Sequence, residues 1–197
     1  MIIQAPMAGV TTPQFVVASC EAGALGSLGA GYMSESVTAS MIYQIREKTT
    51  KPFAVNLFVP EKKTCTNVEA ARAYAKIRTY EKRLGLDEQP LNHPKEAYVE
   101  QCAVCIRERV PYVSFTFGLP SRETVIAMKT KGIRLIGTAT SKKEAEAVEA
   151  GGLDYVVLQS IEAGGHRGSF IEEGQTDWRT LLEETSHLFI PRIVAGS

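Results

Sequence analysis

Residues 134–159 read RLIGTATSKKEAEAVEAGGLDYVVLQ, and their pattern indicates the architecture of the protein. Two short apolar runs, 134–139 and 155–159, enclose a polar segment. That segment opens with Ser141-x-x-Glu144, the pattern of a helix-capping box, and closes at Gly151-Gly152, a helix-ending signal. Strand, helix and strand in this order predict a βαβ unit, whose two strands pair in parallel.

Similar apolar runs recur along the chain, at residues 2–5, 25–29, 53–58, 112–117 and 192–195. They lack the in–out alternation of a half-solvated sheet and favour parallel strands covered on both faces. Thr12-Pro13 predicts the start of another helix, which ends at Gly23. Because no G-x-G-x-x-G motif opens a helix, we expect a (β/α)8 barrel rather than an open dinucleotide-binding sheet.

The connector between the third and fourth runs is unusually long and polar, and we interpret residues 60–110 as a helical insertion. It is either a solvated decoration or a lid over the active face, since an insertion after a strand's carboxyl end lies on that face. A full barrel takes about 250 residues. The 197 residues therefore predict one partial barrel domain, incomplete at the C-terminus, that contains this insertion.

Composition narrows the class of partner. Lys+Arg and Asp+Glu both number 22, so a basic surface for nucleic acid or an anionic membrane is not expected. Neither a membrane span nor a signal peptide is evident, which favours a soluble cytoplasmic protein. Cys102-x-x-Cys105 lacks a second ligand pair at zinc spacing, so we expect buried thiols and no metal site.

Polar residues at strand ends are the first candidates for chemistry, because barrel enzymes react at the carboxyl ends of their strands. Asn56 stands inside an apolar strand, and Gln159 closes another. Each is either a satisfied core amide or a group that meets the polar edge of a planar cofactor. The other candidates are residues 6–9, Thr138 and Thr140.

The strongest candidate lies in residues 160–168, SIEAGGHRG, where three glycines surround His166. Glycine lets the backbone approach a ligand closely, and an imidazole exchanges protons near neutral pH. We therefore expect a functional role for His166. His93 and His187 are interpreted as surface residues.

Several stretches resemble class I nitronate monooxygenases, formerly 2-nitropropane dioxygenases, and in particular their Gram-positive branch. The stretches are IIQAPMAGVTTP (2–13), KPFAVNLFVP (51–60), PYVSFTFGLPS (111–121), IGTATSKKEAEA (136–147) and GLDYVVLQSIEAGGHRGSF (152–170). Ser160 stands where that family usually has glycine, and the resemblance weakens after residue 170. The closing IPRIVAGS resembles the start of a further family motif, and the first strand stands at the N-terminus without the short leader usual in that family, so the chain is expected to be truncated at both ends.

The resemblance implies an FMN-dependent barrel enzyme that oxidises alkyl nitronates, notably propionate 3-nitronate, with O2 to a carbonyl product and nitrite. It implies that His166 is the active-site histidine, which takes a proton from a nitroalkane or holds a nitronate. It assigns contacts with the flavin to Pro6, Met7, Asn56, Gln159, Gly164 and Gly165.

Two rival functions stay open on the sequence. FMN-containing enoyl-acyl-carrier-protein reductase II shares the EAGGH stretch but reduces with NAD(P)H, and it lacks the long insertion and the SFTFGLP motif. A non-catalytic fragment without flavin is the other rival. Because an incomplete barrel has open strand edges, we expect either pairing with another chain through them, as in a homo-oligomer, or disorder near the C-terminus.

Overall fold

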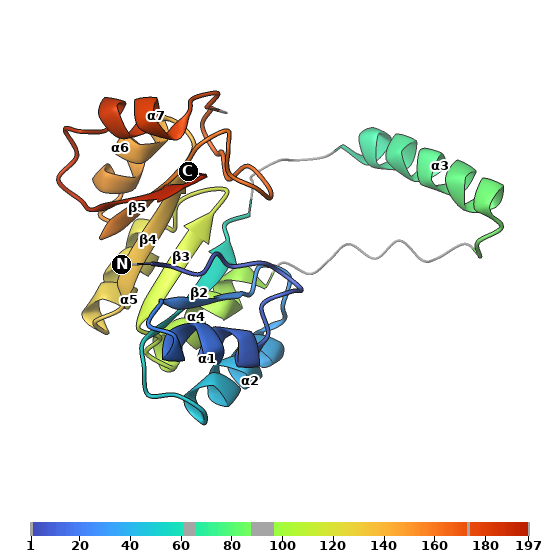
Figure 1. The fold of residues 1–197 in the computed structure, drawn as a ribbon. Helices are drawn as coiled ribbons and strands as arrows, with labels where there is room; N and C mark the ends of the chain where they lie inside the picture. The colour runs from blue at the N-terminus through green and yellow to red at the C-terminus, as the bar shows by residue number, and fades with distance from the viewer. Residues whose placement is uncertain (1, 61–65, 88–96, 173, 197) are drawn as a thin grey trace. The chain divides into compact units, whose positions relative to one another are not determined.

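A computed structural model describes residues 2–60, 66–87, 97–172 and 174–196 (Figure 1). Its elements follow one another in the alternating order that the sequence predicts. They are α1 (Pro13–Glu21), β1 (Gly26–Gly29), α2 (Glu35–Arg46), β2 (Phe53–Phe58), α3 (Asn67–Leu84), α4 (Tyr98–Arg107), β3 (Tyr112–Thr116), α5 (Arg122–Thr130), β4 (Arg134–Ala139), α6 (Lys142–Ala150), β5 (Tyr155–Gln159), α7 (Trp178–Glu184) and β6 (Arg192–Ala195).

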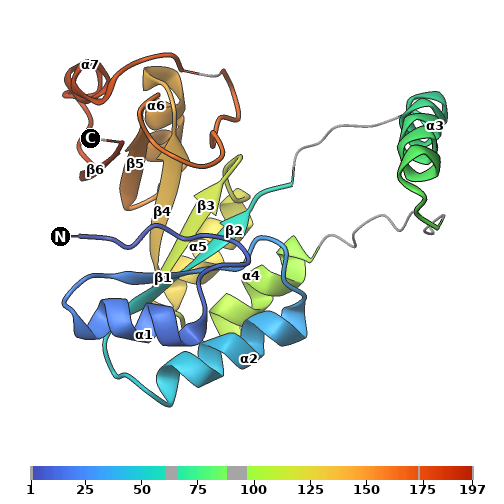
Figure 2. The same cartoon turned by 45° about the vertical axis from the view of Figure 1, so that its right-hand side comes forward.

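The six strands form one parallel sheet in the order β1-β2-β3-β4-β5-β6. Sequential order is the topology of a barrel wall, because a doubly wound sheet reverses its order at a switch point. Figure 2 shows the strands fanning into a curved wall with helices packed along it. The prediction of an incomplete (β/α)8 barrel is confirmed.

Side chains alternate between the two faces of this wall. The face that meets the helices carries the main core, with Val55, Leu57, Val113, Phe115 and Leu135 at 2% exposure or less. A smaller apolar cluster contains Leu25, Ala54 and Ile136, which occupy alternate positions to those core residues. Beyond this cluster, toward the carboxyl ends, the same face carries polar residues. Because side chains alternate along a strand, the polar candidates lie on the face of the sheet that points away from the helices.

The first expected strand, residues 2–5, is wrong as a full strand, since only Ile3 pairs, through one parallel bridge to Leu25. Gln4 donates its N–H to the Leu25 carbonyl, but the next ladder position is taken by its side chain, which accepts from the N–H of Ser27 at 2.9 Å. Pro6 then ends the ladder, because proline has no N–H to donate.

The helix starts follow their capping residues. Thr12 caps α1 by accepting from the N–H of Phe15, as predicted. Ser141 caps α6 by accepting from the N–H of Glu144, but the reciprocal half of the expected capping box is absent from the described contacts. The Glu144 carboxylate instead binds backbone groups outside the helix, among them the N–H of Thr140.

The chain divides into two compact units, residues 1–60 with 97–197, and residues 61–96. Of the stretch 60–110 that we expected as an insertion, α4 therefore belongs to the sheet unit. Its Gln101 donates to the Ala30 and Met33 carbonyls, and Cys102 and Cys105 are buried as expected. The other unit contains α3, which begins with a true capping box of Thr66 and Glu69 and ends at the left-handed Gly85.

Candidate functional site at the strand ends

Asn56 lies on the inner face of β2 and is 4% exposed. Its amide nitrogen donates to the hydroxyls of Ser114 and Thr116 on β3, each at 3.0 Å. Both amide protons therefore have partners within the sheet, and the carboxamide oxygen is the atom that can accept from a ligand. The amide is a satisfied core group and also a fixed acceptor near the strand ends.

The turn with Pro6 and Met7 packs directly on the end of β1. The Met7 carbonyl accepts from the N–H groups of Val10 and Thr11 and from the Thr11 hydroxyl. That hydroxyl in turn accepts from the N–H of Gly29 at 2.8 Å. A Cβ on Gly29 would lie 2.7 Å from the backbone of Met7, so only glycine permits this approach. The turn is thereby held beside Asn56, the register partner of Gly29.

Gln159 ends β5 and binds the backbone of the segment that carries His166. Its amide nitrogen donates to the His166 carbonyl at 2.9 Å, and its amide oxygen accepts from the N–H of Gly168 at 2.7 Å. Gly168 is buried, and a Cβ there would lie 2.9 Å from Thr138 and 3.0 Å from Thr116. The segment therefore rests on the ends of β3, β4 and β5.

The residues just before this contact are open. Gly164, Gly165 and His166 are exposed. A Cβ on either glycine would meet no heavy atom within 4 Å, and Gly165 has a φ of +81°, which favours glycine. His166 is therefore presented on a stretch whose two ends are fixed and whose centre has room for a ligand.

The structure joins the expected site residues into one row. Met7 contacts Gly29, Gly29 pairs with Asn56, and Asn56 bonds Thr116. Gly168 packs on Thr116 and bonds Gln159, which holds His166. Pro6 and Met7 thus lie at one end of the row and His166 at the other.

An aromatic cluster beside this row was not anticipated from the sequence. The Phe58 ring meets Tyr32 at a centroid distance of 5.2 Å and Phe117 at 4.9 Å, both edge-to-face. Phe117 has a φ of +67°, an uncommon conformation for a bulky residue. Because Phe58 and Phe117 follow Asn56 and Thr116 at the strand ends, the row has an apolar side.

Two charged residues were also missed as parts of the site. Arg167, next to His166, donates to backbone carbonyls at the two ends of the loop that carries His166. The fully buried Glu144 accepts from a backbone N–H of the same loop. For Glu144 the sequence offered only the spacing Ser141-x-x-Glu144, which predicts a capping box. That pattern gives no indication of the contact between Glu144 and the loop after β5.

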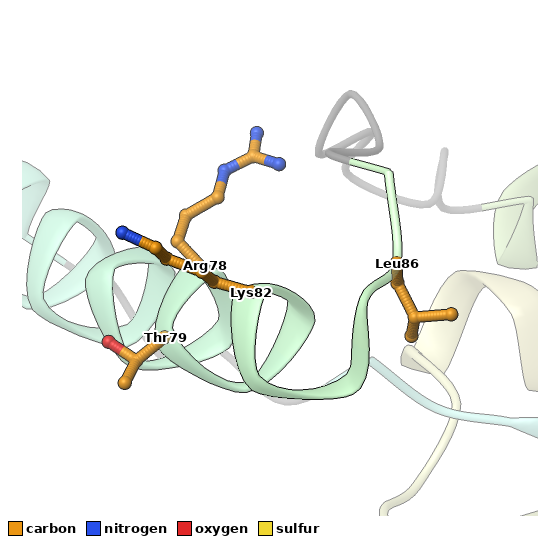
Figure 3. A pocket seen from close by; sticks show the side chains of 4 residues that line it. All are labelled: Arg78, Thr79, Lys82 and Leu86. Carbon is orange, nitrogen blue, oxygen red and sulfur yellow. The ribbon is translucent and has the colours of Figure 1, made fainter.

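The described chain also has a hollow to which none of the expected site residues contributes. This hollow, of about 350 Å³ beside α3, is lined by Arg78, Thr79, Lys82 and Leu86, whose side chains diverge (Figure 3). None of the expected site residues lines it, and Arg78 pairs with Glu81. Within residues 2–60, 66–87, 97–172 and 174–196, no cluster of His, Cys, Asp and Glu suits a metal ion. No helix there has the length and apolarity that crossing a membrane requires.

A sequential parallel wall with its polar row at the carboxyl strand ends defines a protein of the (β/α)8-barrel class. The family model for nitronate monooxygenase matches residues 1–197, and the chain belongs to that family. The resemblance seen in the motifs is thereby confirmed.

Individual relatives agree with this family. A probable nitronate monooxygenase of Staphylococcus haemolyticus is 40% identical over 202 residues, covering 99% of this chain and 57% of the relative. That of Staphylococcus saprophyticus is 42% identical over 172 residues, covering 87% and 48%. The chain thus spans about half the length of the curated relatives it matches.

Solved structures show the same fold. Nitroalkane oxidase from Streptomyces ansochromogenes superposes with a TM-score of 0.84 at 35% identity, covering 98% of this chain and 57% of that one. FabK from Thermotoga maritima superposes with a TM-score of 0.73 at 27% identity, covering 98% and 49%. The nitroalkane oxidase is therefore more similar to this chain than FabK is, in both sequence and fold.

Proposed function

We propose that this chain oxidises alkyl nitronates, of the propionate 3-nitronate type, with O2 to a carbonyl product and nitrite, using FMN. The observation that carries the proposal is His166, presented on an open glycine stretch whose flanks are fixed to the strand ends. Membership of the nitronate monooxygenase family supports it. The nitroalkane oxidase among the structural relatives supports it further, because its name gives a nitro compound as the substrate.

The residues of the row fit FMN. The space beside Gly164 and Gly165 admits a group that approaches their backbone, and such exposed N–H groups suit a phosphate. Asn56 offers a fixed carboxamide oxygen to a polar ring edge, and Pro6 and Met7 lie beside it. Phe58 and Phe117 add an apolar side that suits a planar aromatic ring. When bound, FMN supplies the electron transfer and the reaction with O2.

The chain's own part in the reaction is to bind, orient and exchange a proton. In the proposed mechanism, the His166 imidazole takes the proton from the carbon next to the nitro group of a neutral nitroalkane. With a preformed nitronate no proton is removed, and the imidazole holds the anion. Gln159 keeps the His166 backbone in place, so the point from which the imidazole extends is fixed relative to the end of β5.

Oxygen uptake tests the proposal against its main rival. With FMN added, we expect propionate 3-nitronate to cause oxygen consumption and nitrite release by this chain. NAD(P)H oxidation that depends on an enoyl thioester, without nitronate turnover, would instead establish the reductase function. A folded chain that turns over neither substrate would contradict both enzymatic functions.

The cytoplasm is the proposed location, because Cys20, Cys102 and Cys105 are free thiols and such thiols persist in reducing compartments. The proposed partners are the nitronate or nitroalkane substrate, O2 and, through the open strand edges, a second copy of the chain.

A further inference from the structure

The loop that carries His166 comprises residues 160–172 and 174 of the described chain, and two charged side chains bind its backbone. We propose that Glu144 and Arg167 are positioning residues that fix this loop, and through it His166, over the strand ends. The inference rests on the proposed function only for the role of His166, and the loop contacts themselves are independent of any activity.

Glu144 holds the second half of the loop. One carboxylate oxygen accepts from the N–H groups of Phe170 and Ile171, at 2.5 and 2.8 Å. The other accepts from the N–H and the hydroxyl of Thr140, at 2.7 and 2.9 Å. Glu144 is 0% exposed, so water does not replace these donors. A buried carboxylate is stable only where donors surround it, and here most of them are backbone N–H groups.

Arg167 holds the neck of the loop. Its guanidinium donates to the carbonyls of Gln159 and Ser160 at the start of the loop and to the Gly174 carbonyl at its end, the last at 2.8 Å. One planar group with several donors therefore joins the start of the loop to its end. The donors of a lysine ammonium all lie on one nitrogen, so lysine does not reproduce the spacing of the guanidinium nitrogens.

The two sets of contacts are linked through Thr140 and Gly174, because Thr140 bonds both Glu144 and Gly174 and Arg167 binds the Gly174 carbonyl. The Thr140 hydroxyl accepts from the N–H of Gly174, at 3.2 Å, and donates to Glu144. Space is tight here, because a Cβ on Gly174 would lie 1.7 Å from the Thr140 carbonyl oxygen. Glu144 thus holds Phe170 and Ile171, Arg167 holds Gly174, and Gln159 fixes the peptides on both sides of Arg167. His166 inherits its position from these contacts.

Hydrogen exchange of the unliganded chain tests the loop directly. Glu144→Gln keeps the shape of the side chain but replaces one of its two acceptor oxygens with an amide nitrogen, which donates and cannot accept from N–H groups. We expect exchange in the peptide covering 166–174 to accelerate at least tenfold, with strand peptides unchanged. Glu146→Gln, on the exposed face of the same helix, is the matched control and should leave exchange as in the parent.

Arg167 supplies a second, separate test, which decides the matter if Glu144→Gln does not fold. Arg167→Lys should accelerate exchange in the same peptide, whereas Arg122→Lys, at an exposed site on α5, should not. Arg167→Ala should regain part of its protection when guanidinium is added at a non-denaturing concentration. Parent-like exchange in Arg167→Lys would overturn the role of Arg167, and parent-like exchange in a folded Glu144→Gln would overturn that of Glu144.

Kinetics show whether the contacts act through His166. In a chain that oxidises neutral nitroethane, Glu144→Gln should lower kcat/KM at least tenfold. In a His166→Ala background the same change should lower it less than twofold, because coupled residues are not additive. Full additivity would overturn the positioning role. An inactive parent would contradict the proposed function alone, since the exchange data still decide whether the loop is held.

Discussion

At the scale of single residues, the glycines around His166 are present for different reasons. Gly168 is buried, and a side chain there would press on Thr116 and Thr138. Gly165 has the left-handed backbone. Gly164 has neither constraint, because its φ is ordinary and the space around it is open. The fold itself therefore does not require glycine at position 164, and we interpret the open space beside this residue as room for a ligand.

Gly164→Ala separates these reasons. We expect its free energy of unfolding to stay within about 0.5 kcal/mol of the parent's, because nothing lies within 4 Å of the new methyl group. Its dissociation constant for FMN should rise at least about tenfold, or about 1.4 kcal/mol. Fluorescence titration and urea denaturation measure the two quantities. Unchanged FMN affinity would show that the cofactor does not approach this residue.

His166→Ala tests the proton-transfer role. Oxidation of neutral nitroethane should fall by about 10²-fold or more, because only this substrate needs a base. Oxidation of preformed ethyl nitronate should fall much less. His187→Ala, at an exposed pair with Glu146, is the control. Equal rates of the variant and the parent on nitroethane would remove His166 from the role of base.

At the scale of elements, capping residues set where the helices begin, and α1 is the case nearest the site. Thr12 caps this helix, and the adjacent Thr11 carries the bond between Met7 and Gly29. The entry into α1 and the turn with Pro6 and Met7 are therefore one continuous structure.

Thr12→Ala should lower the free energy of unfolding by about 1 kcal/mol, because the N–H of Phe15 loses its acceptor. Thr12→Ser keeps the hydroxyl and should stay within a few tenths of the parent. Urea denaturation followed by circular dichroism measures both. A Thr12→Ala chain as stable as Thr12→Ser would contradict the cap.

Local signals made most elements predictable. The six strands and the starts of α1 and α6 depend on neighbours within a few residues, and the sequence predicts them. The first expected strand failed because a side chain, Gln4, replaced a ladder contact. The role of Glu144 was hidden because its partners lie 26 and 27 residues away. Contacts of that separation leave no periodic trace in a sequence.

At the scale of the whole molecule, the main core between the sheet and the helices includes the α4 thiols. Burial raises the pKa of the Cys102 thiol to about 11, and burial raises that of Cys105 as well. Both thiols are therefore protonated at neutral pH and screened from reagents. Their reactivity reports unfolding of the whole sheet unit.

Iodoacetamide at about pH 8 should label Cys102 and Cys105 in urea and leave them unlabelled in the native chain. The raised pKa of Cys102 also predicts a pH effect. Its contribution to stability is complete below about pH 9, its unfolded value, and is lost as the pH rises toward about 11. Cys102→Ala should therefore lose less stability than the parent across that window, as measured by denaturation. Native labelling as fast as in urea would contradict the buried position.

The proposed function depends most directly on whether this chain binds FMN. The measurement is an absorption spectrum of the purified chain after incubation with excess FMN and removal of unbound cofactor, with release and quantification on denaturation. We predict about one FMN for each chain, with a spectrum shifted from that of free FMN. A folded chain that retains no FMN would contradict the cofactor site at the strand ends, and with it the proposed oxidation of nitronates.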